Sequence, residues 1–268
     1  MTKFLSAEQL RFWDENGYLL LKGFFTDIKK TALQDWVSDL EQRPETPGKW
    51  MKYFEPSKRK DGPQRLLCRV ENFIQYHDGF DELLRGPTLL GIVSELMGEE
   101  AVLFKEKINF KLSGGSGFAA HQDAPAFVTF NQKYHITLMV GVDRATPENG
   151  CLEVVRGRHK EGILPQAPDK TLDPAFAETL HCEPVPTEAG DVLLFDSFIP
   201  HRSGANLTQT ARRALYITYN RKSEGERRED YYADKRRNFP PECERIPGKD
   251  YSSGAGIYNV GNPIQAGN

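Results

Sequence analysis

Short segments of β type fill most of residues 101–220, and this feature restricts the fold more than any other. The segments are rich in β-branched and aromatic residues, and turn residues separate them without helical patterns in between. Strands at this spacing with no intervening helices favour an antiparallel sandwich or barrel. The predicted strands are AVLFKEKINFKL, AFVTF, YHITLMVGV, CLEVV, DVLLF and ALYITYN.

The residues before this β-rich region favour helices. The segment SAEQLRFW begins with a capping-box pattern and predicts a helix that ends near Gly17. YLLLKGFF predicts a strand, and apolar residues at helical spacing then predict a second helix over residues 27–42. DELLRGPTLLGIVSELMG predicts two short helices, broken at Gly86 and stopped at Gly98.

Two polar segments are expected to lie outside the core. Residues 43–65 contain four prolines, two glycines and many charges, which predicts a long surface loop of the kind that often closes over an active site. The C-terminal residues are rich in charge, glycine and proline, so we expect an extended or partly disordered segment, with a substrate-contacting lid as the alternative. The chain is thus predicted to be a single domain of α+β class, mainly β with flanking helices: a helical part (about 1–100), a β core (about 101–220) and an extended segment (about 221–268).

Charge, cysteine spacing and the lack of long apolar segments limit the expected partners and location of the protein. The net charge is −3, so no overall basic field favours nucleic acid, and a small molecule or another protein is the expected partner. The four cysteines form no CxxC pair, which is typical of reduced thiols in the cytoplasm. The first residues lack a signal-peptide pattern and the best apolar run is broken by Lys22, so we expect neither export nor a membrane span.

A histidine and an aspartate one residue apart follow a glycine-rich turn, in a chain with only six histidines. In extended backbone the side chains of His121 and Asp123 point to the same side, so they can converge on one point. His201 follows an apolar strand and a proline, and it is a candidate third ligand. Two histidines and one carboxylate form the facial triad that is typical of non-haem Fe(II) oxygenases. Each pattern taken alone also occurs by chance, most often as a surface hydrogen bond.

Two residues that follow His201 support this interpretation. Arg212 lies eleven positions later, just before an alternating strand, and Ser203 lies two positions later. A guanidinium and a hydroxyl beside a metal suit the distal carboxylate of a dicarboxylate co-substrate, because the guanidinium binds a carboxylate through two parallel hydrogen bonds. Without such a partner an inward arginine would carry an unpaired buried charge.

Together these motifs resemble one family. HQD, NGCLEVVRGRH, AGDVLLFDSFIPHRSGAN and the following RR, in this order, are similar to the phytanoyl-CoA dioxygenase family of Fe(II)- and 2-oxoglutarate-dependent oxygenases, and so is the opening LSAEQLRFWDENGYLLLKGFF. The resemblance covers most of residues 4–220 and implies a double-stranded β-helix core, also called a jelly roll or cupin-like fold. RGRH departs from the family's more usual proline-glycine-serine-histidine turn.

Carried over residue by residue, the resemblance implies that His121, Asp123 and His201 bind Fe(II). Related halogenases have a small residue in place of the carboxylate so that chloride can bind, whereas Asp123 is present here. The resemblance therefore implies a dioxygenase that uses O2 to hydroxylate an aliphatic carbon and converts 2-oxoglutarate to succinate and CO2.

The same resemblance implies that Arg212, with Ser203, binds the far carboxylate of 2-oxoglutarate. Arg213 is the competing choice, but the family's spacing and the strand alternation favour Arg212.

Other polar side chains near the site are open to two interpretations. Asn109, Lys107 and Lys111 share one face of KEKINFKL by alternation, and they form either a solvated outer face or part of the cavity wall, where they contact 2-oxoglutarate or an anionic substrate. His135 is the strongest rival ligand among the remaining histidines, although a place near the site is the less favoured outcome for it.

Basic residues surround these segments, which indicates an anionic small molecule, and the polar presumed lid regions favour a small polar metabolite over a long acyl chain. The resemblance implies candidates such as an aminoalkylphosphonate or an amino-acid derivative. Oxygenation of a natural product or an acyl-CoA is the alternative within the family. A non-enzymatic jelly-roll binding module is an alternative of another class, and it would be expected to have a broken triad. A hydrolase that uses Ser203 or Ser197 is disfavoured because no nucleophile-elbow glycine pattern surrounds either serine.

Overall fold

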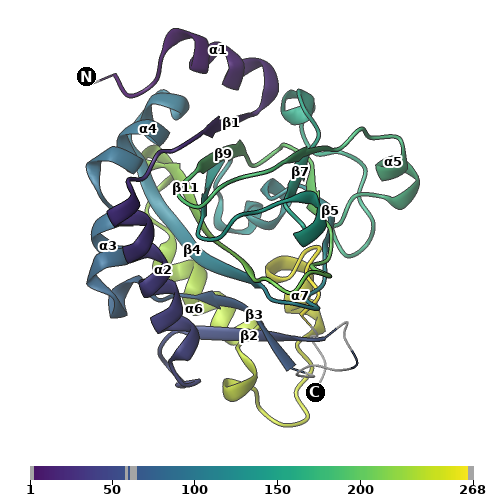
Figure 1. Ribbon diagram of the computed structural model, residues 1–268. Coiled ribbons are helices and arrows are strands. Elements are labelled where there is room, and N and C mark those ends of the chain that lie inside the picture. Colours follow the sequence, from purple (N-terminus) through teal and green to yellow (C-terminus); the bar gives the residue numbers. More distant parts are fainter. Residues whose placement is uncertain (1–2, 58–59, 61–64, 265–268) are drawn as a thin grey trace.

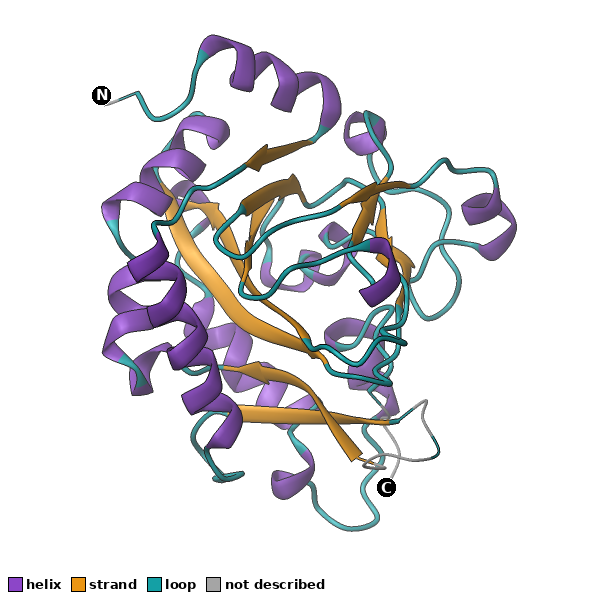
Figure 2. Ribbon diagram, viewed as in Figure 1, coloured by secondary structure: helices purple, strands orange, loops and turns teal. Residues whose placement is uncertain are grey.

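Two antiparallel sheets and a set of helices make up the structure (Figures 1 and 2). The computed structural model describes residues 3–57, 60 and 65–264. The strands are β1 (Tyr18–Leu21), β2 (Met51–Pro56), β3 (Arg65–Glu71), β4 (Ala101–Lys111), β5 (Phe118–His121), β6 (His135–Gly141), β7 (Leu152–Val154), β8 (Glu183–Val185), β9 (Val192–Asp196), β10 (His201–Ser203) and β11 (Arg212–Arg221). Seven of them form the larger sheet in the order β1-β9-β6-β11-β4-β3-β2, and four form the smaller sheet in the order β5-β10-β7-β8.

The helices predicted before the β core are confirmed. The first helix has Ser6 as its N-cap in a capping box and ends at Gly17, whose φ of 76° is a left-handed conformation that glycine adopts without strain. The helix predicted over residues 27–42 has those bounds. The two short helices break at Gly86 and stop at Gly98 as expected. The helices are α1 (Ala7–Asn16), α2 (Asp27–Gln42), α3 (Asp78–Leu84), α4 (Pro87–Met97), α5 (Pro174–Glu178), α6 (Arg228–Asn238) and α7 (Ser252–Tyr258).

Strand alternation gives the larger sheet two different faces. One face is apolar and packs against the helices α2, α3 and α4 along its side (Figure 2), so that Val37 of α2 and Val93 of α4 share a core with Leu138 of β6 and Ile217 of β11. The other face looks toward the smaller sheet, where Met139 and residues of β7, β9 and β11 form a second core. Every residue of β6 is buried, because both of its faces are covered.

Two local predictions are wrong. Residues 43–65 were expected to be a surface loop, but they contain β2, which pairs with β3 and has buried residues along most of its length. The segment AFVTF was expected to be a strand, but residues 124–130 form two short 3₁₀ turns. Residues 58–59 and 61–64 of the expected loop lie outside the described residues.

The C-terminal segment is a further correction, because it contains the helices α6 and α7 instead of extended chain (Figure 1). α6 packs on the larger sheet through polar contacts. Lys235 forms a buried ion pair with Glu71 of β3 at 2.6 Å, and the Tyr232 hydroxyl lies between the backbone N–H and C=O of Glu106 in β4. Charged residues that suggested solvated chain are thus satisfied by partners inside the fold.

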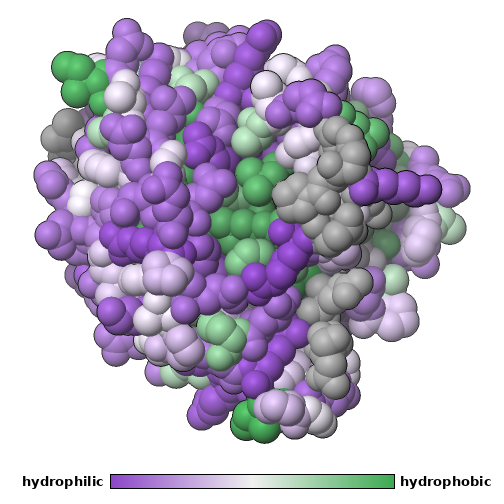
Figure 3. Space-filling model, turned by 60° about the horizontal axis from the view of Figure 1, so that its bottom comes forward, coloured by the Kyte–Doolittle hydropathy of each residue, from purple (hydrophilic) through white to green (hydrophobic). Residues whose placement is uncertain are grey.

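The outer surface is mainly hydrophilic on the face shown in Figure 3, with hydrophobic residues gathered near its centre. Within the described ranges, no helix is long and apolar enough to cross a bilayer. All four cysteines are free thiols.

We expect the substitution Tyr232→Phe to destabilise the fold by about 1–3 kcal/mol, because it leaves the buried N–H and C=O of Glu106 without their shared partner. Urea unfolding followed by circular dichroism measures this. Tyr76→Phe is the matched control, since its hydroxyl makes one exposed 3.3 Å bond, and it should cost less than about 0.5 kcal/mol. Equal stability of the two variants would contradict the structural role of α6.

Candidate metal centre

The pairing of β5 with β10 brings two histidines together. His121 is the last residue of β5 and His201 is the first residue of β10, and the two are directly opposite in the antiparallel register. Their ring centroids are 4.3 Å apart. Both side chains are buried.

Asp123 completes the group by a different geometry from the one predicted. Its backbone is not extended but helical, with φ −75° and ψ −34°, because it precedes the first 3₁₀ turn. The carboxylate still reaches the site: its Oδ1 is 3.8 Å from His121 Nε2. One ligand atom from each of His121, Asp123 and His201 lies within 4.8 Å of the others, so the three residues could hold a metal ion.

Backbone carbonyls set which nitrogen of each imidazole is available. His121 Nδ1 lies 2.7 Å from the carbonyl oxygen of Ala119, and His201 Nδ1 lies 3.1 Å from that of Ile199. A carbonyl only accepts, so both Nδ1 atoms carry hydrogen and donate it. The unprotonated Nε2 atoms are therefore left to bind a metal, which is the usual arrangement of metal-binding histidines.

The protonation states in the cluster also suit a cation. Burial, followed by the neighbouring His201, lowers the pKa of His121 to about 3, and burial lowers the pKa of His201, so both rings are neutral at neutral pH. Burial alone would raise the pKa of Asp123, but His201 and the lysines Lys107 and Lys105 hold it well below its ordinary value. Two neutral imidazoles beside a carboxylate are a fitting donor set for Fe(II).

Arg212 and Arg213 have different environments, although they are neighbours in sequence. Arg213 is paired with Asp143 at 2.8 Å and with Glu41 at 3.3 Å. Arg212 is almost fully buried, and within the described part of the chain its Nε and Nη1 atoms have no hydrogen-bond partner. Its Nη2 contacts only the hydroxyl of Tyr216 and a methionine sulfur. Arg212 therefore has guanidinium N–H groups available to bind a ligand, whereas Arg213 is held by Asp143 and Glu41.

Ser203 and Asn109 lie on strands around the same space. The ammonium group of Lys111 donates to Ser203 Oγ at 2.8 Å, and Lys111 is opposite Arg212 in the register of β4 and β11. Asn109 is buried and its Oδ1 has no partner among the described residues. Asn109 and Lys111 are thus buried and Lys107 is partly buried, so the solvated outer face that was one of the two interpretations is wrong.

A cavity of about 30 Å³ lies at this cluster. The metal-capable triad and Ser203 line it, together with residues that the sequence patterns did not single out. These residues are Phe118, Leu152, Phe195, Arg202, Tyr216 and Asn262. Alternation along β11 could have found Tyr216, whereas no signal in the C-terminal segment pointed to Asn262.

The C-terminal segment closes one side of the cavity. Asn262 lines both this cavity and a wider adjoining groove of about 950 Å³. Gly261 accepts a hydrogen bond from the Ala119 N–H, and a Cβ at Gly261 would lie 3.0 Å from His121 Nδ1. The backbone at Gly261 therefore approaches His121 as closely as a residue without a side chain allows.

The other histidines lie outside the metal-capable group. His135 is buried and its Nε2 is 2.8 Å from Gln132 Oε1, with Phe104 and Phe127 against the ring. His77 caps α3 by accepting from the N–H of Phe80.

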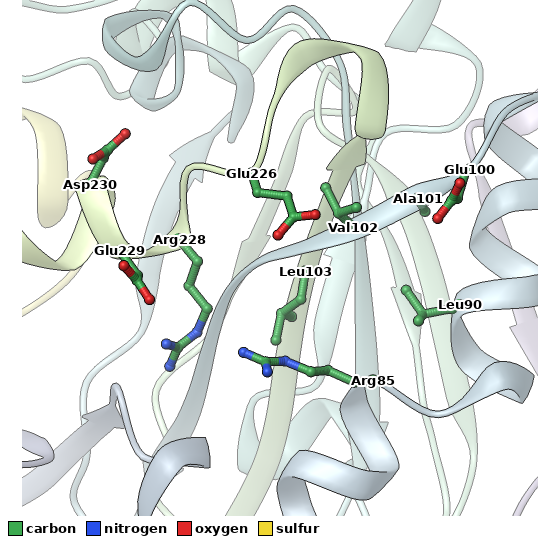
Figure 4. Close-up of a pocket in the computed structure, with 10 residues that line it drawn as sticks. All are labelled: Arg85, Leu90, Glu100, Ala101, Val102, Leu103, Glu226, Arg228, Glu229 and Asp230. Carbon is green, nitrogen blue, oxygen red and sulfur yellow. The ribbon is translucent and has the colours of Figure 1, made fainter.

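A separate pocket of about 560 Å³ lies between the start of β4 and the segment that leads into α6 (Figure 4). Arg85 and Arg228 point toward each other across it in this view. Arg228 is already paired with Glu106 at 2.6 Å, and Arg85 lies 3.4 Å from Asp81. The residues lining this pocket include none of the metal-capable triad.

Comparison with known proteins agrees with the geometry. The model of the phytanoyl-CoA dioxygenase (PhyH) family matches residues 13–214. The chain is 55% identical over 262 residues to a 2-aminoethylphosphonate dioxygenase of the uncultured bacterium HF130_AEPn_1, with 98% of this chain and 99% of the relative covered. It is 43% identical over 239 residues to a methylphosphonate hydroxylase of Gimesia maris, with 89% and 90% covered.

Solved structures share the fold at low sequence identity. EctD from S. alaskensis, crystallised with 2-oxoglutarate and 5-hydroxyectoine, matches with a TM-score of 0.67 and 20% identity over 82% of this chain and 78% of its own. AviO1 from Streptomyces viridochromogenes Tue57 matches with a TM-score of 0.66 and 22% identity over 82% and 96%. The predicted mainly β fold with a double-stranded β-helix core is confirmed.

The buried His135 should make stability depend on pH. Burial lowers the pKa of His135 to about 3, whereas the unfolded chain takes up the proton near 6.5. The stability contributed by the neutral ring is therefore complete above pH 6.5 and is lost as the pH falls toward 3, at about 1.4 kcal/mol per pH unit. Urea unfolding between pH 5 and 7 should show a shallower dependence for His135→Asn than for the unsubstituted protein. His181→Asn is the exposed control, and an equal change in both variants would contradict this assignment.

Proposed function

Because the chain belongs to the phytanoyl-CoA dioxygenase family, we propose that His121, Asp123 and His201 hold Fe(II) in an enzyme that hydroxylates an aliphatic carbon of an aminoalkylphosphonate. The family, the dioxygenase class and the use of Fe(II), 2-oxoglutarate and O2 agree with the expectations from the sequence. When bound, iron and 2-oxoglutarate supply the activation of O2 that converts a C–H bond to an alcohol, with succinate and CO2 as co-products.

The observation that carries the proposal is the buried group of three ligand atoms within 4.8 Å. Both imidazoles are oriented by backbone carbonyls, and Thr137 donates to the second oxygen of Asp123 at 3.3 Å. These outer contacts fix the rings and the carboxylate before a metal arrives. A facial set of three protein ligands leaves the remaining coordination positions for a co-substrate and O2.

Arg212 is proposed to bind the far carboxylate of 2-oxoglutarate, with Ser203 beside it. A buried guanidinium with two unpartnered nitrogen atoms is costly unless an anion binds it, and a carboxylate fits its paired donors. Lys111 holds the Ser203 hydroxyl as an acceptor, so the serine's own hydrogen is free to donate to the carboxylate. Asn109 is proposed as a further contact, because its buried amide lines the cavity.

The identity of the substrate is supported by the relatives. Two relatives that each cover about nine tenths of this chain or more are named for phosphonates, one of them an aminoalkylphosphonate. We therefore place a small phosphonate ahead of an acyl-CoA or a natural product. Succinate release with Fe(II), ascorbate and a panel containing 2-aminoethylphosphonate, methylphosphonate and an acyl-CoA tests this. Coupled turnover of the acyl-CoA alone would overturn the substrate assignment and keep the enzyme class.

The hydrolase alternative has no geometric support. Ser203 Oγ accepts from a lysine, and no histidine hydrogen-bonds to it or to Ser197 in the described part of the chain. The signature expected of a binding module, a broken triad, is also not what the structure has.

Asp123→Ala should abolish Fe(II) binding and lower turnover by more than about a hundredfold, because loss of a direct ligand exceeds the roughly 10–100-fold effect of losing outer partners. Iron content and succinate release measure the two effects, and circular dichroism checks that the fold survives. Asp250→Ala removes an exposed carboxylate and serves as the control. Unchanged turnover in Asp123→Ala would remove this residue from the metal site.

Substitution of the two neighbouring arginines separates binding from folding. Arg212→Met should raise the KM for 2-oxoglutarate by about 10–100-fold without loss of stability, because it removes charged hydrogen bonds to the ligand and an unpaired buried charge from the fold. Arg213→Met should leave that KM unchanged and lower the unfolding midpoint, because it breaks the pairs with Asp143 and Glu41. The reverse pattern would assign the co-substrate to Arg213.

A further inference from the structure

β4 places four polar side chains in a row on the face that looks toward the metal-capable group. Lys105, Lys107, Asn109 and Lys111 alternate along this long strand of the larger sheet (Figure 1). Lys111 stands at the end beside Arg212, where the co-substrate carboxylate is proposed to bind. Lys107 lines the cavity together with the metal-capable residues. Lys105 therefore extends the row away from the co-substrate end.

Lys105 and Lys107 lack the partners that the neighbouring lysines have. Lys111 makes hydrogen bonds to Ser203 and to two backbone carbonyls. For Lys105 and Lys107 the described residues provide no hydrogen bond and no ion pair. Their ammonium groups lie over aromatic rings: Lys105 is 4.4 Å from the ring centre of Phe127, and Lys107 is 5.3 Å from that of Tyr216.

The nearby carboxylates are already engaged. Glu71 is bonded to Arg69 at 2.9 Å and to Lys235 at 2.6 Å, which places two cations on one anion. Asp123 belongs to the metal-capable group. Among the described residues, neither amine therefore has a hydrogen-bonded carboxylate of its own. Burial lowers the pKa of Lys105 and lowers that of Lys107 to about 7, so keeping both amines charged beside the site is costly unless an anionic ligand neutralises them.

We propose that Lys105 and Lys107 bind the phosphonate group of the substrate. The inference rests on the proposed function, since it assigns the substrate-binding residues of that same site. The two anions of the reaction then bind toward opposite ends of β4: the co-substrate carboxylate at the Lys111 end, and the substrate phosphonate at the Lys105 end. The metal-capable residues lie between them, next to the carbon chain of the substrate.

The chemistry of the pair favours a phosphonate over a carboxylate. Two ammonium groups match the two negative charges and three acceptor oxygens of a phosphonate dianion, whereas a carboxylate would neutralise only one of them. Lysine binds phosphate-like groups as a point charge and needs no fixed fork geometry. The aromatic rings beside both amines limit access of water and so strengthen the attraction.

Lys235 is a structural lysine in the same region and serves as the comparison for Lys105 and Lys107. It is fully buried and paired with Glu71, so Lys235→Met should destabilise the fold. Lys105→Met and Lys107→Met remove amines that have no hydrogen-bonded carboxylate among the described residues, so these two variants should keep or gain stability while they lose ligand affinity. A structural role would predict the opposite.

The test is calorimetric titration of 2-aminoethylphosphonate into the anaerobic holoenzyme loaded with Fe(II) and 2-oxoglutarate. Lys105→Met and Lys107→Met should each weaken binding by about tenfold or more, because each loses one charged contact. The KM for 2-oxoglutarate should stay unchanged in Lys105→Met. Lys222→Met, which removes an exposed charge that does not line the cavity, is the control and should bind like the unsubstituted protein.

A second ligand makes the assignment specific to the phosphonate. 3-Aminopropanoate has a carboxylate in its place, so it should bind more weakly than 2-aminoethylphosphonate and should lose less affinity in the two lysine variants. Lys105→Arg keeps the charge and should recover part of the binding.

The outcomes separate the two proposals. Folded Lys105→Met and Lys107→Met proteins that bind 2-aminoethylphosphonate like the unsubstituted protein would overturn the lysine assignment and leave the proposed function standing. Loss of folding in both variants would also overturn it, because it would make the lysines structural. An unsubstituted holoenzyme that neither binds nor oxidises any phosphonate would overturn the proposed substrate, and the lysine assignment with it.

Discussion

The antiparallel pairing of β5 with β10 is the interaction on which the site depends. It sets His121 opposite His201, two residues far apart in the sequence, and holds both rings on the same side of the smaller sheet. A slip of one residue would turn one ring to the other face. β7 pairs with the other edge of β10, where Val154 lies opposite His201, and so secures this register from the far side. The two histidines of the metal-capable group therefore lie on paired strands, and Asp123 follows β5 after Gln122, at the start of a 3₁₀ turn.

The larger sheet supports this arrangement because one of its faces packs against helices and the other carries the polar residues near the site. The period of two along each strand sends apolar residues such as Leu138 and Ile217 toward the helices, and it sends the residues between them toward the smaller sheet. On β4 and β11 the inward positions include Lys107, Asn109 and Tyr216. A strongly apolar outer core thus stabilises strands whose inner faces are polar enough to bind ligands.

The sequence predicted the features that depend on residues close together in the chain. The α1 cap, the bounds of α2 and the helix stop at Gly98 each follow from residues within a few positions, and the HxD pair with His201 matches a known motif. The elements that were predicted wrongly depend on distant partners. The charged sequence of α6 is typical of solvated chain, and its place on the sheet depends on the ion pair of Lys235 with the distant Glu71. The sequence of β2 is typical of a loop, and the segment is a strand because it pairs with β3. Asn262 carries no local signal, because only the folded chain brings the C-terminal segment to the cavity.

The C-terminal segment also determines the charge of the site. Glu71 lies near Lys105 and attracts it, and alone it would offer that lysine a protein partner. Lys235 from α6 and Arg69 occupy Glu71 instead, and Arg69 is itself held by the carbonyl of Tyr258 and by Asn262. The C-terminal segment therefore does more than cover the sheet. Because it engages Glu71, it leaves Lys105 and Lys107 without a hydrogen-bonded carboxylate among the described residues, and an incoming anion would balance their charge.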